Sequence, residues 1–135
     1  DEFLRLQGVL NKTIMFVTHD FDEALRLADR IAIMKDGIIE QLDTPDNIVL
    51  NPATEYVKKF TQDVPREKVI KIESIMDPVD STISNNIKIS KNDLIEKVAE
   101  TILNSKESLN VIDPNDDKIV GSLNPSKVIK VLFGS

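Results

Sequence analysis

The stretch Thr13-Ile14-Met15-Phe16-Val17-Thr18-His19-Asp20 runs directly into Phe21-Asp22-Glu23-Ala24-Leu25, and these residues decide the fold class. The apolar residues 14–17 predict a buried β-strand that ends on His19, the only histidine in the sequence. In parallel α/β sheets, ligands bind at the carboxyl ends of the strands. The sequence therefore predicts that His19 lies at the mouth of a strand-to-helix turn where a ligand could bind.

The helix predicted after this turn has an N-terminal cap and one apolar face. Asp20 is a favoured cap residue, and Glu23 completes a capping box. The apolar residues of the helix recur at the spacing of one helical face: Phe21, Ala24, Leu25 and Ala28. A buried strand followed at once by an amphipathic helix indicates the α/β fold class.

His19 has three interpretations when it is taken alone. A lone histidine at a strand end is usually a polar edge residue that bonds a backbone carbonyl. A catalytic dyad of His19 and Asp20 in an unrelated α/β hydrolase stays open, although the sequence has no G-x-S-x-G nucleophile elbow. A metal site is not supported, because there is no second histidine and no cysteine.

A set of matches around His19 follows the order found in one protein family. The matching residues are Thr13-Ile14-Met15-Phe16-Val17-Thr18-His19-Asp20, Asp22-Glu23-Ala24, Asp29-Arg30-Ile31-Ala32-Ile33-Met34, Gly37, Gln41, Thr44-Pro45, Asn51-Pro52-Ala53 and Tyr56-Val57. With them, residues 13–60 resemble the C-terminal part of the nucleotide-binding subunit of an ABC transporter. The resemblance looks closest to the ATPase subunits of glycine betaine/proline importers, which serve osmoprotection. A long run of matches in order is more specific than one short motif.

The resemblance implies a role for His19 and a set of partners. His19 would be the switch histidine, which hydrogen-bonds the γ-phosphate of ATP in the intact subunit, where Mg²⁺ is also bound. The subunit would pair with a second copy of itself and contact a transmembrane permease. It would therefore be cytoplasmic and peripheral on the inner face of the cell membrane.

The sequence does not contain the motifs that would let this stretch hydrolyse ATP by itself. The four glycines, at positions 8, 37, 121 and 134, do not allow the P-loop pattern G-x-x-x-x-G-K-[ST]. The ABC signature and the Walker B strand are missing as well, and the sequence does not begin with methionine. We therefore expect a C-terminal fragment of an ATPase subunit, with no ATPase activity and no tightly bound cofactor of its own.

Composition sets outer limits on function. The net charge of −6 provides no basic stripe for phosphates, so we predict no nucleic-acid partner. The absence of cysteine excludes a disulfide scaffold and suits a cytoplasmic protein. No apolar run approaches the roughly 20 residues that a membrane-spanning helix needs. A membrane contact is therefore expected to come through a partner.

Residues 1–62 are expected to form the C-terminal part of the ATPase domain. Residues 30–43 predict a β-hairpin around the turn dipeptide Asp36-Gly37. Thr44-Pro45 and Asn51-Pro52 each predict the start of a helix. The second of these helices would carry Tyr56, Val57 and Phe60 on one face.

Residues 63–71 separate two different patterns. They are polar, contain Pro65 and have no periodicity, so we predict a linker there. Beyond it the elements expected in residues 72–135 are a strand around 81–86, a helix capped by Ser90 and Asp93, strands at 109–112 and 118–123, and a last helix opened by Asn124-Pro125. The predicted order is βαββα.

This order, with Ser74-Ile75-Met76, Val111-Ile112-Asp113 and Ile119-Val120-Gly121, resembles a single CBS motif. CBS motifs work in pairs, since one alone leaves part of its sheet uncovered. We therefore expect residues 72–135 to pair with the same segment of another chain and to regulate transport. The alternative function is a stand-alone CBS ligand-sensing module with an ATPase-like scaffold segment.

The ligand of such a module would be a nucleotide or an anionic membrane surface. The resemblance places Asn124 where a hydroxyl residue is expected, and Lys127 where an aspartate would hold the ribose. A lysine cannot accept hydrogen bonds from ribose hydroxyls. Ordinary adenosine binding is therefore disfavoured, and Lys127 would suit an anionic ligand or be a solvated helix lysine.

Overall fold

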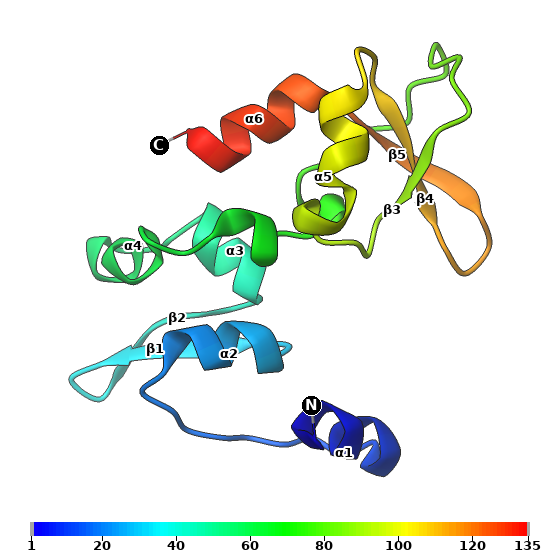
Figure 1. Cartoon of the computed structure of the whole chain (residues 1–135). Helices are drawn as coiled ribbons and strands as arrows, with labels where there is room; N and C mark the ends of the chain where they lie inside the picture. Colours follow the sequence, from blue (N-terminus) through cyan, green and yellow to red (C-terminus); the bar gives the residue numbers. More distant parts are fainter. Residues whose placement is uncertain (1, 135) are drawn as a thin grey trace. The chain divides into compact units, whose positions relative to one another are not determined.

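The computed structural model describes residues 2–134 and has a mixed α/β fold (Figure 1). The chain divides into two compact units, Asp1–Val64 and Pro65–Ser135. Each unit has its own small β-sheet and its own helices. The predicted α/β class is confirmed at this level.

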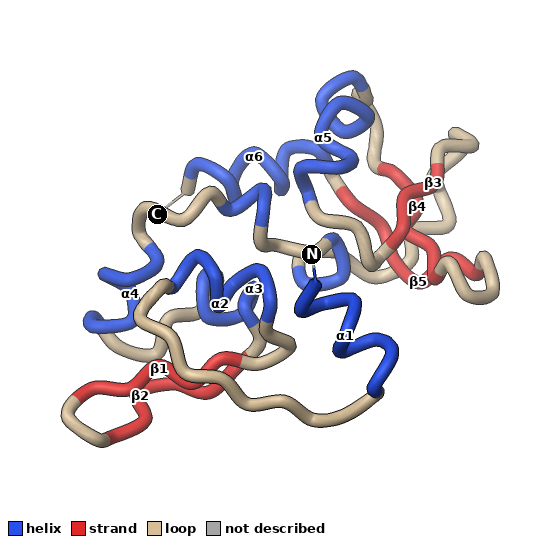
Figure 2. Tube along the Cα trace, turned by 60° about the horizontal axis from the view of Figure 1, so that its bottom comes forward, coloured by secondary structure: helices blue, strands red, loops and turns tan. Residues whose placement is uncertain are grey.

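The first unit is built around a β-hairpin covered by short helices (Figure 2). Its elements are α1 (Glu2–Leu10), α2 (Phe21–Leu27), β1 (Ile31–Lys35), β2 (Ile38–Asp43), α3 (Pro45–Leu50) and α4 (Glu55–Thr61). Its core consists of Ile31, Ile33, Ile48 and Val57, with Phe21, Ala24, Leu25, Ala28 and Tyr56 packed against it. The predicted apolar face of the helix after Asp20 is therefore confirmed.

The hairpin forms where the sequence predicts it. β1 and β2 are antiparallel, and Lys35 pairs with Ile38 across the turn. Asp36 and Gly37 both have positive φ, at 51° and 77°, as a type I′ turn requires. The turn dipeptide thus sets the register of the two strands.

The strand predicted over residues 14–17 is wrong. Residues 11–20 form neither helix nor strand, and the side chains of Met15 and Val17 are 92% and 91% exposed. A strand needs a neighbour for its backbone hydrogen bonds, and within residues 2–134 the hairpin strands pair only with each other. His19 therefore lies in a loop before α2.

Two helices follow the hairpin, and the sequence predicts the start of the first correctly but not the start of the second. Thr44 caps α3 as predicted, with its hydroxyl accepting from the Asn47 N–H. α4 begins at Glu55 with Thr54 as its cap, and the predicted start at Asn51-Pro52 is wrong. Gln41 bonds the Asn51 carbonyl at 3.1 Å and the Ala53 N–H at 2.8 Å, which holds residues 51–53 as a connection.

The second unit contains a three-stranded sheet and two helices. Its elements are β3 (Lys88–Ser90), α5 (Ile95–Asn104), β4 (Leu109–Asp113), β5 (Lys118–Leu123) and α6 (Pro125–Phe133), preceded by the short 3₁₀ turns Arg66–Lys68 and Ile72–Ser74. The sheet order is β3-β4-β5, with β3 parallel and β5 antiparallel to β4. Both predicted strands of the 109–123 hairpin are present.

The first strand of this unit lies later than predicted. Residues 81–86 are turn and loop, because the Asp80 carboxylate accepts from the Thr82 N–H and the Asn85 side chain accepts from the Ile87 N–H. Such local bonds favour turns over strands. The strand begins only at Lys88.

The start of α5 depends on a distant segment. Ser90 and Asp93 do not cap it, and its N-cap Leu94 has no side-chain bond. Instead, the Ile95 N–H donates to the Ile70 carbonyl at 3.0 Å, and the Ile72 N–H donates to the Asp93 carbonyl at 2.9 Å. Ile70, within the stretch expected to be a linker, is fully buried in the second unit.

Candidate functional site

His19 is presented by a short turn that its two neighbours stabilise. The Thr18 hydroxyl accepts from the Asp20 N–H at 3.0 Å, and the Asp20 carboxylate accepts from the Glu23 N–H at 3.1 Å. Asp20 is thus the N-cap of α2, as predicted. Thr18, and not the Glu23 side chain, bonds the cap residue's own N–H. The His19 side chain is exposed between these two anchored residues.

A surface hollow of about 440 Å³ lies beside His19. It is lined by the turn itself and by the end of the first unit: His19, Asp20, Phe21, Asp22, Phe60, Asp63 and Val64. The structure therefore brings the start of α2 together with the end of α4 and the residues after it, beside this histidine. The sequence pointed to His19, but it did not predict that Phe60, Asp63 and Val64 form the other side of the hollow.

Two aromatic side chains, Phe21 and Phe60, are among the residues that line the hollow. Phe21 and Phe60 meet edge to face with ring centroids 5.7 Å apart, and Tyr56 meets Phe60 at 5.0 Å. The Lys35 ammonium lies 4.9 Å from the centre of the Tyr56 ring. The helical pattern of Tyr56 and Phe60 predicted their shared face, but their partner on α2 is too distant in sequence to be found by periodicity.

The side chains that line the hollow could make one hydrogen bond to a phosphate group, but they could not hold a whole nucleotide. Its ionisable lining groups are the His19 imidazole and the carboxylates of Asp20, Asp22 and Asp63. An imidazole can donate one hydrogen bond to a phosphate oxygen, whereas the carboxylates repel phosphate. Among residues 2–134 no group of three His, Cys, Asp or Glu side chains could hold a metal ion.

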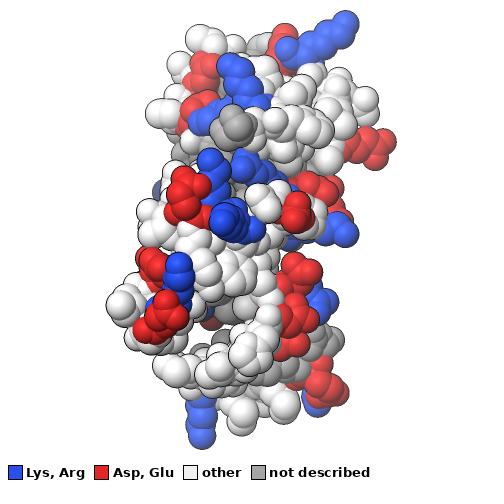
Figure 3. Space-filling model, turned by 90° about the vertical axis from the view of Figure 1, so that its left-hand side faces the viewer, with Lys and Arg blue, Asp and Glu red and all other residues white. Residues whose placement is uncertain are grey.

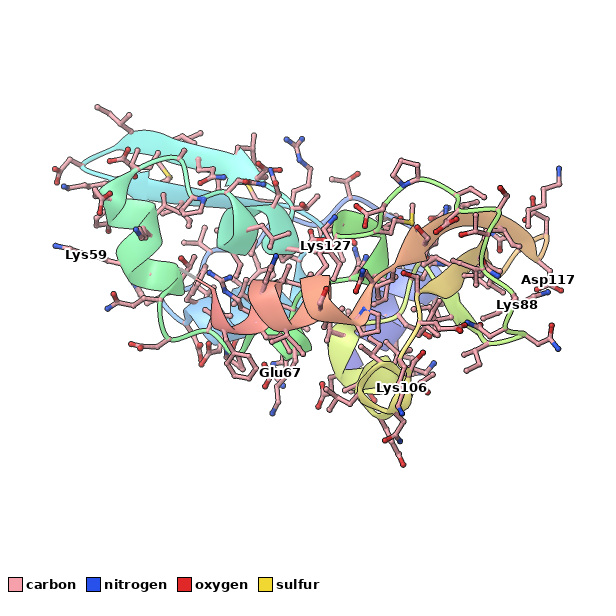
Figure 4. The ribbon with its side chains drawn as sticks, turned by 90° about the horizontal axis from the view of Figure 1, so that it is seen from above. Lys59, Glu67, Lys88, Lys106, Asp117 and Lys127 are labelled. Atoms are coloured by element: carbon pink, nitrogen blue, oxygen red, sulfur yellow. The ribbon has the colours of Figure 1, made fainter. Side chains whose placement is uncertain are left out.

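The predicted ligand residues of the second unit make internal contacts. The Asn124 side chain caps α6 by accepting from the Ser126 N–H at 2.9 Å and the Ser126 hydroxyl at 2.8 Å. Lys127, labelled on α6 in Figure 4, pairs with Asp77 at 2.7 Å. Asp77 is also bridged to Ser122 through the backbone. Asn124 is therefore used to cap α6, and Lys127 is used to hold the segment at Asp77 against this helix.

A second hollow, of about 300 Å³, lies in the loop before β3. It is lined by Asp80, Thr82, Ile83, Ser84, Glu107 and Ser108. The hydroxyl and then the backbone N–H of Thr82 lower the pKa of Asp80 below its usual value. The Asp80 carboxylate is therefore ionised near neutral pH and bonded within its own turn.

Charges of both signs are mixed over the surface. On the face shown in Figure 3, Lys and Arg side chains stand beside Asp and Glu side chains. The whole chain carries 17 basic and 23 acidic residues. Within the described part of the chain, no helix is long and apolar enough to cross a bilayer.

The chain is similar over nearly its whole length to ATP-binding proteins of transport systems. It is 65% identical over 133 residues to the trimethylamine N-oxide transport system ATP-binding protein TmoW of Pelagibacter ubique, covering 98% of this chain and 39% of that protein. It is 43% identical over 134 residues to TmoW of Ruegeria pomeroyi, covering 98% of this chain and 38% of that protein.

A third relative carries a different substrate name. The glycine betaine/carnitine/choline transport ATP-binding protein OpuCA of Bacillus subtilis is 38% identical over 154 residues, covering 100% of this chain and 40% of that protein. The chain thus spans about two fifths of the length of these relatives. No protein-family model matches the chain.

Proposed function

We propose that this chain is the C-terminal part of the ATP-binding subunit of an ABC importer for small osmoprotectants. Similarity over 98% of the chain to two transport ATP-binding proteins supports this assignment. The sequence alone suggested glycine betaine or proline as the cargo. The relatives' names favour compounds with a trimethylated nitrogen: trimethylamine N-oxide, glycine betaine, carnitine and choline.

The observation that carries the proposal is the exposed His19 on an anchored turn beside a hollow. In the intact subunit, His19 donates one hydrogen bond to the γ-phosphate of ATP. ATP and Mg²⁺ are held there chiefly by residues outside this chain, because the other ionisable groups lining the hollow are carboxylates. Thr18 and Asp20 orient the imidazole by fixing the backbone on either side of it.

ATP turnover by the full-length subunit, assembled with its permease, tests this role. We expect His19→Ala to lower kcat by about 100-fold, the usual loss when one donor to a developing charge is removed. Lys59→Ala, an exposed change on α4, is the matched control and should keep normal turnover. Unchanged turnover in His19→Ala would contradict the proposal.

The second unit is proposed to be a regulatory CBS-type module that pairs with a second copy of itself. The order β3-α5-β4-β5-α6 and the strand order β3-β4-β5 support this assignment. Its regulator would be a nucleotide or an anionic membrane surface. The subunit as a whole would lie at the inner face of the membrane through its permease.

A stand-alone ligand-sensing module is the second candidate function. The observation that favours it is the buried core of the second unit, in which Ile70, Ile72, Ile95, Leu109, Val111 and Leu123 are fully buried. Hydrogen exchange with and without ATP, AMP or anionic vesicles distinguishes the candidates. Ligand-dependent protection confined to residues 72–133, with no role for His19 in turnover, would favour the second candidate.

A further inference from the structure

Phe60 joins two parts of the first unit that are far apart in sequence. It lies near the end of α4, and its ring meets Phe21, the first residue of α2, at 5.7 Å. Phe60 also lines the hollow beside His19. Because Tyr56 packs against both Phe60 and the core, the ring is held from its other side.

The loop that carries His19 is held by individual side-chain contacts and not by a helix or a strand. Residues 11–20 form no helix or strand, and His19 itself is exposed. On its C-terminal side the loop is fixed where Phe21 enters the core. Edge-to-face ring pairs have a preferred geometry, so such a contact sets the orientation of each ring in addition to burying it. Removing the Phe60 ring would take away the contact that sets the orientation of the Phe21 ring, and the backbone at His19 would shift with it.

We propose that Phe60 is a positioning residue for His19, acting through Phe21; its catalytic meaning rests on the proposed function. Val64, the last residue of the first unit, lines the same hollow. The contact between Phe60 and Phe21 therefore lies close in sequence to the last residue of the first unit.

Proton NMR of the 135-residue chain tests the positioning directly, because its only histidine gives one set of imidazole C–H signals. In Phe60→Leu these signals should move toward their positions in a short peptide of residues 15–23. Phe60→Tyr, which keeps the ring, should restore them. Val79→Ala, at a 54% exposed side chain in the second unit, is the control and should leave them unchanged.

Methyl signals of Ile48 and Val57 report whether the core of the first unit is intact. Unmoved imidazole signals in Phe60→Leu with an intact core would overturn the proposal. If Phe60→Leu loses the core signals, Phe60→Met decides the question by the same criterion, because the unbranched methionine side chain has a similar volume to leucine and adapts better to an irregular space.

Kinetics of the full-length subunit separate this inference from the proposed function. Phe60→Leu should lower kcat about tenfold with little change in the KM for ATP, since a displaced imidazole weakens transition-state contacts more than ground-state binding. Normal kcat in Phe60→Leu, together with the expected loss of kcat in His19→Ala, would overturn the positioning role. Normal kcat in His19→Ala would instead contradict the proposed role of His19 in turnover. The NMR signals would still show whether Phe60 holds the imidazole in position.

Discussion

Asp20 bonds the first turn of α2 through its carboxylate, which accepts from the Glu23 N–H at 3.1 Å. Replacing a cap residue by alanine usually costs about 1 kcal/mol, whereas asparagine caps about as well as aspartate. We therefore expect Asp20→Ala to lower the free energy of unfolding of the first unit by about 1 kcal/mol and Asp20→Asn to change it little. Urea unfolding followed by circular dichroism measures both. Equal losses of unfolding free energy in the two variants would show that Asp20 stabilises the unit through its charge and not through its cap hydrogen bond.

Asp43 makes the stability of the first unit depend on pH. The Asn47 side chain, and then the Thr44 backbone N–H, lower the pKa of Asp43 below its usual 3.8. A lowered folded-state pKa gives stability that is present above pH 3.8 and is lost as the pH falls through the folded-state value. Asp43→Asn should therefore flatten the fall in unfolding free energy as the pH drops below 3.8. The comparison needs urea unfolding at several pH values, and equal slopes for the two proteins would contradict this assignment.

The β1–β2 hairpin depends on backbone conformation more than on packing. Gly37 has φ of 77°, where a side chain is strained, whereas Gly8 lies within α1 with open space around it. We expect Gly37→Ala to destabilise the first unit by about 1 kcal/mol. Gly8→Ala is the matched control and should stabilise α1 slightly, because alanine favours helices. Thermal unfolding of both variants checks the opposite signs.

The elements that the sequence predicts correctly are those specified by local residues. Asp36-Gly37 sets the hairpin turn, and Thr44 caps α3 within its own segment. The start of α5 could not be predicted in this way, because its first N–H group, that of Ile95, donates to the distant carbonyl of Ile70 and not to a nearby cap. Likewise, Gln41 delays α4 through bonds to residues ten and twelve positions away. Such partners are known only once the chain has folded.

The same distinction applies to the candidate site. His19 and Asp20, the cap of α2, were predicted from neighbouring residues, whereas Phe60 and Asp63 reach the hollow through tertiary packing. The strand expected over residues 14–17 failed for a related reason. Hydrophobicity predicts that a segment will be buried, but Met15 and Val17 are exposed because nothing in residues 2–134 covers them.

At the scale of the whole molecule, the two units differ in how much apolar surface they enclose. Among the described residues, seven of the ten largest fully buried side chains lie in the second unit, while the first unit leaves Met15, Val17, Ile38 and Ile39 more than half exposed. Large exposed apolar surfaces mark contacts with other chains or segments. This agrees with our proposal that the first unit is completed by further residues of a longer subunit.

The proposed pairing of the second unit predicts its behaviour in solution. Its packed helices α5 and α6 leave Leu103, Ile129 and Phe133 exposed at 69%, 48% and 83%. If two copies cover these side chains, the chain should have a dimeric mass at micromolar concentration. Ile129→Lys should then shift the mass toward the monomer, because a buried lysine at the interface would lose its hydration.

Sedimentation equilibrium measures this mass for the chain and its variants. Ile119→Lys, at a 41% exposed position on β5, is the control for adding a charge outside the two helices and should leave the dimer intact. A monomeric mass for the unchanged chain would contradict the pairing. Equal dissociation by both variants would instead place the pairing surface on the sheet as well as on the helices, since an introduced charge disrupts only the surface that becomes buried.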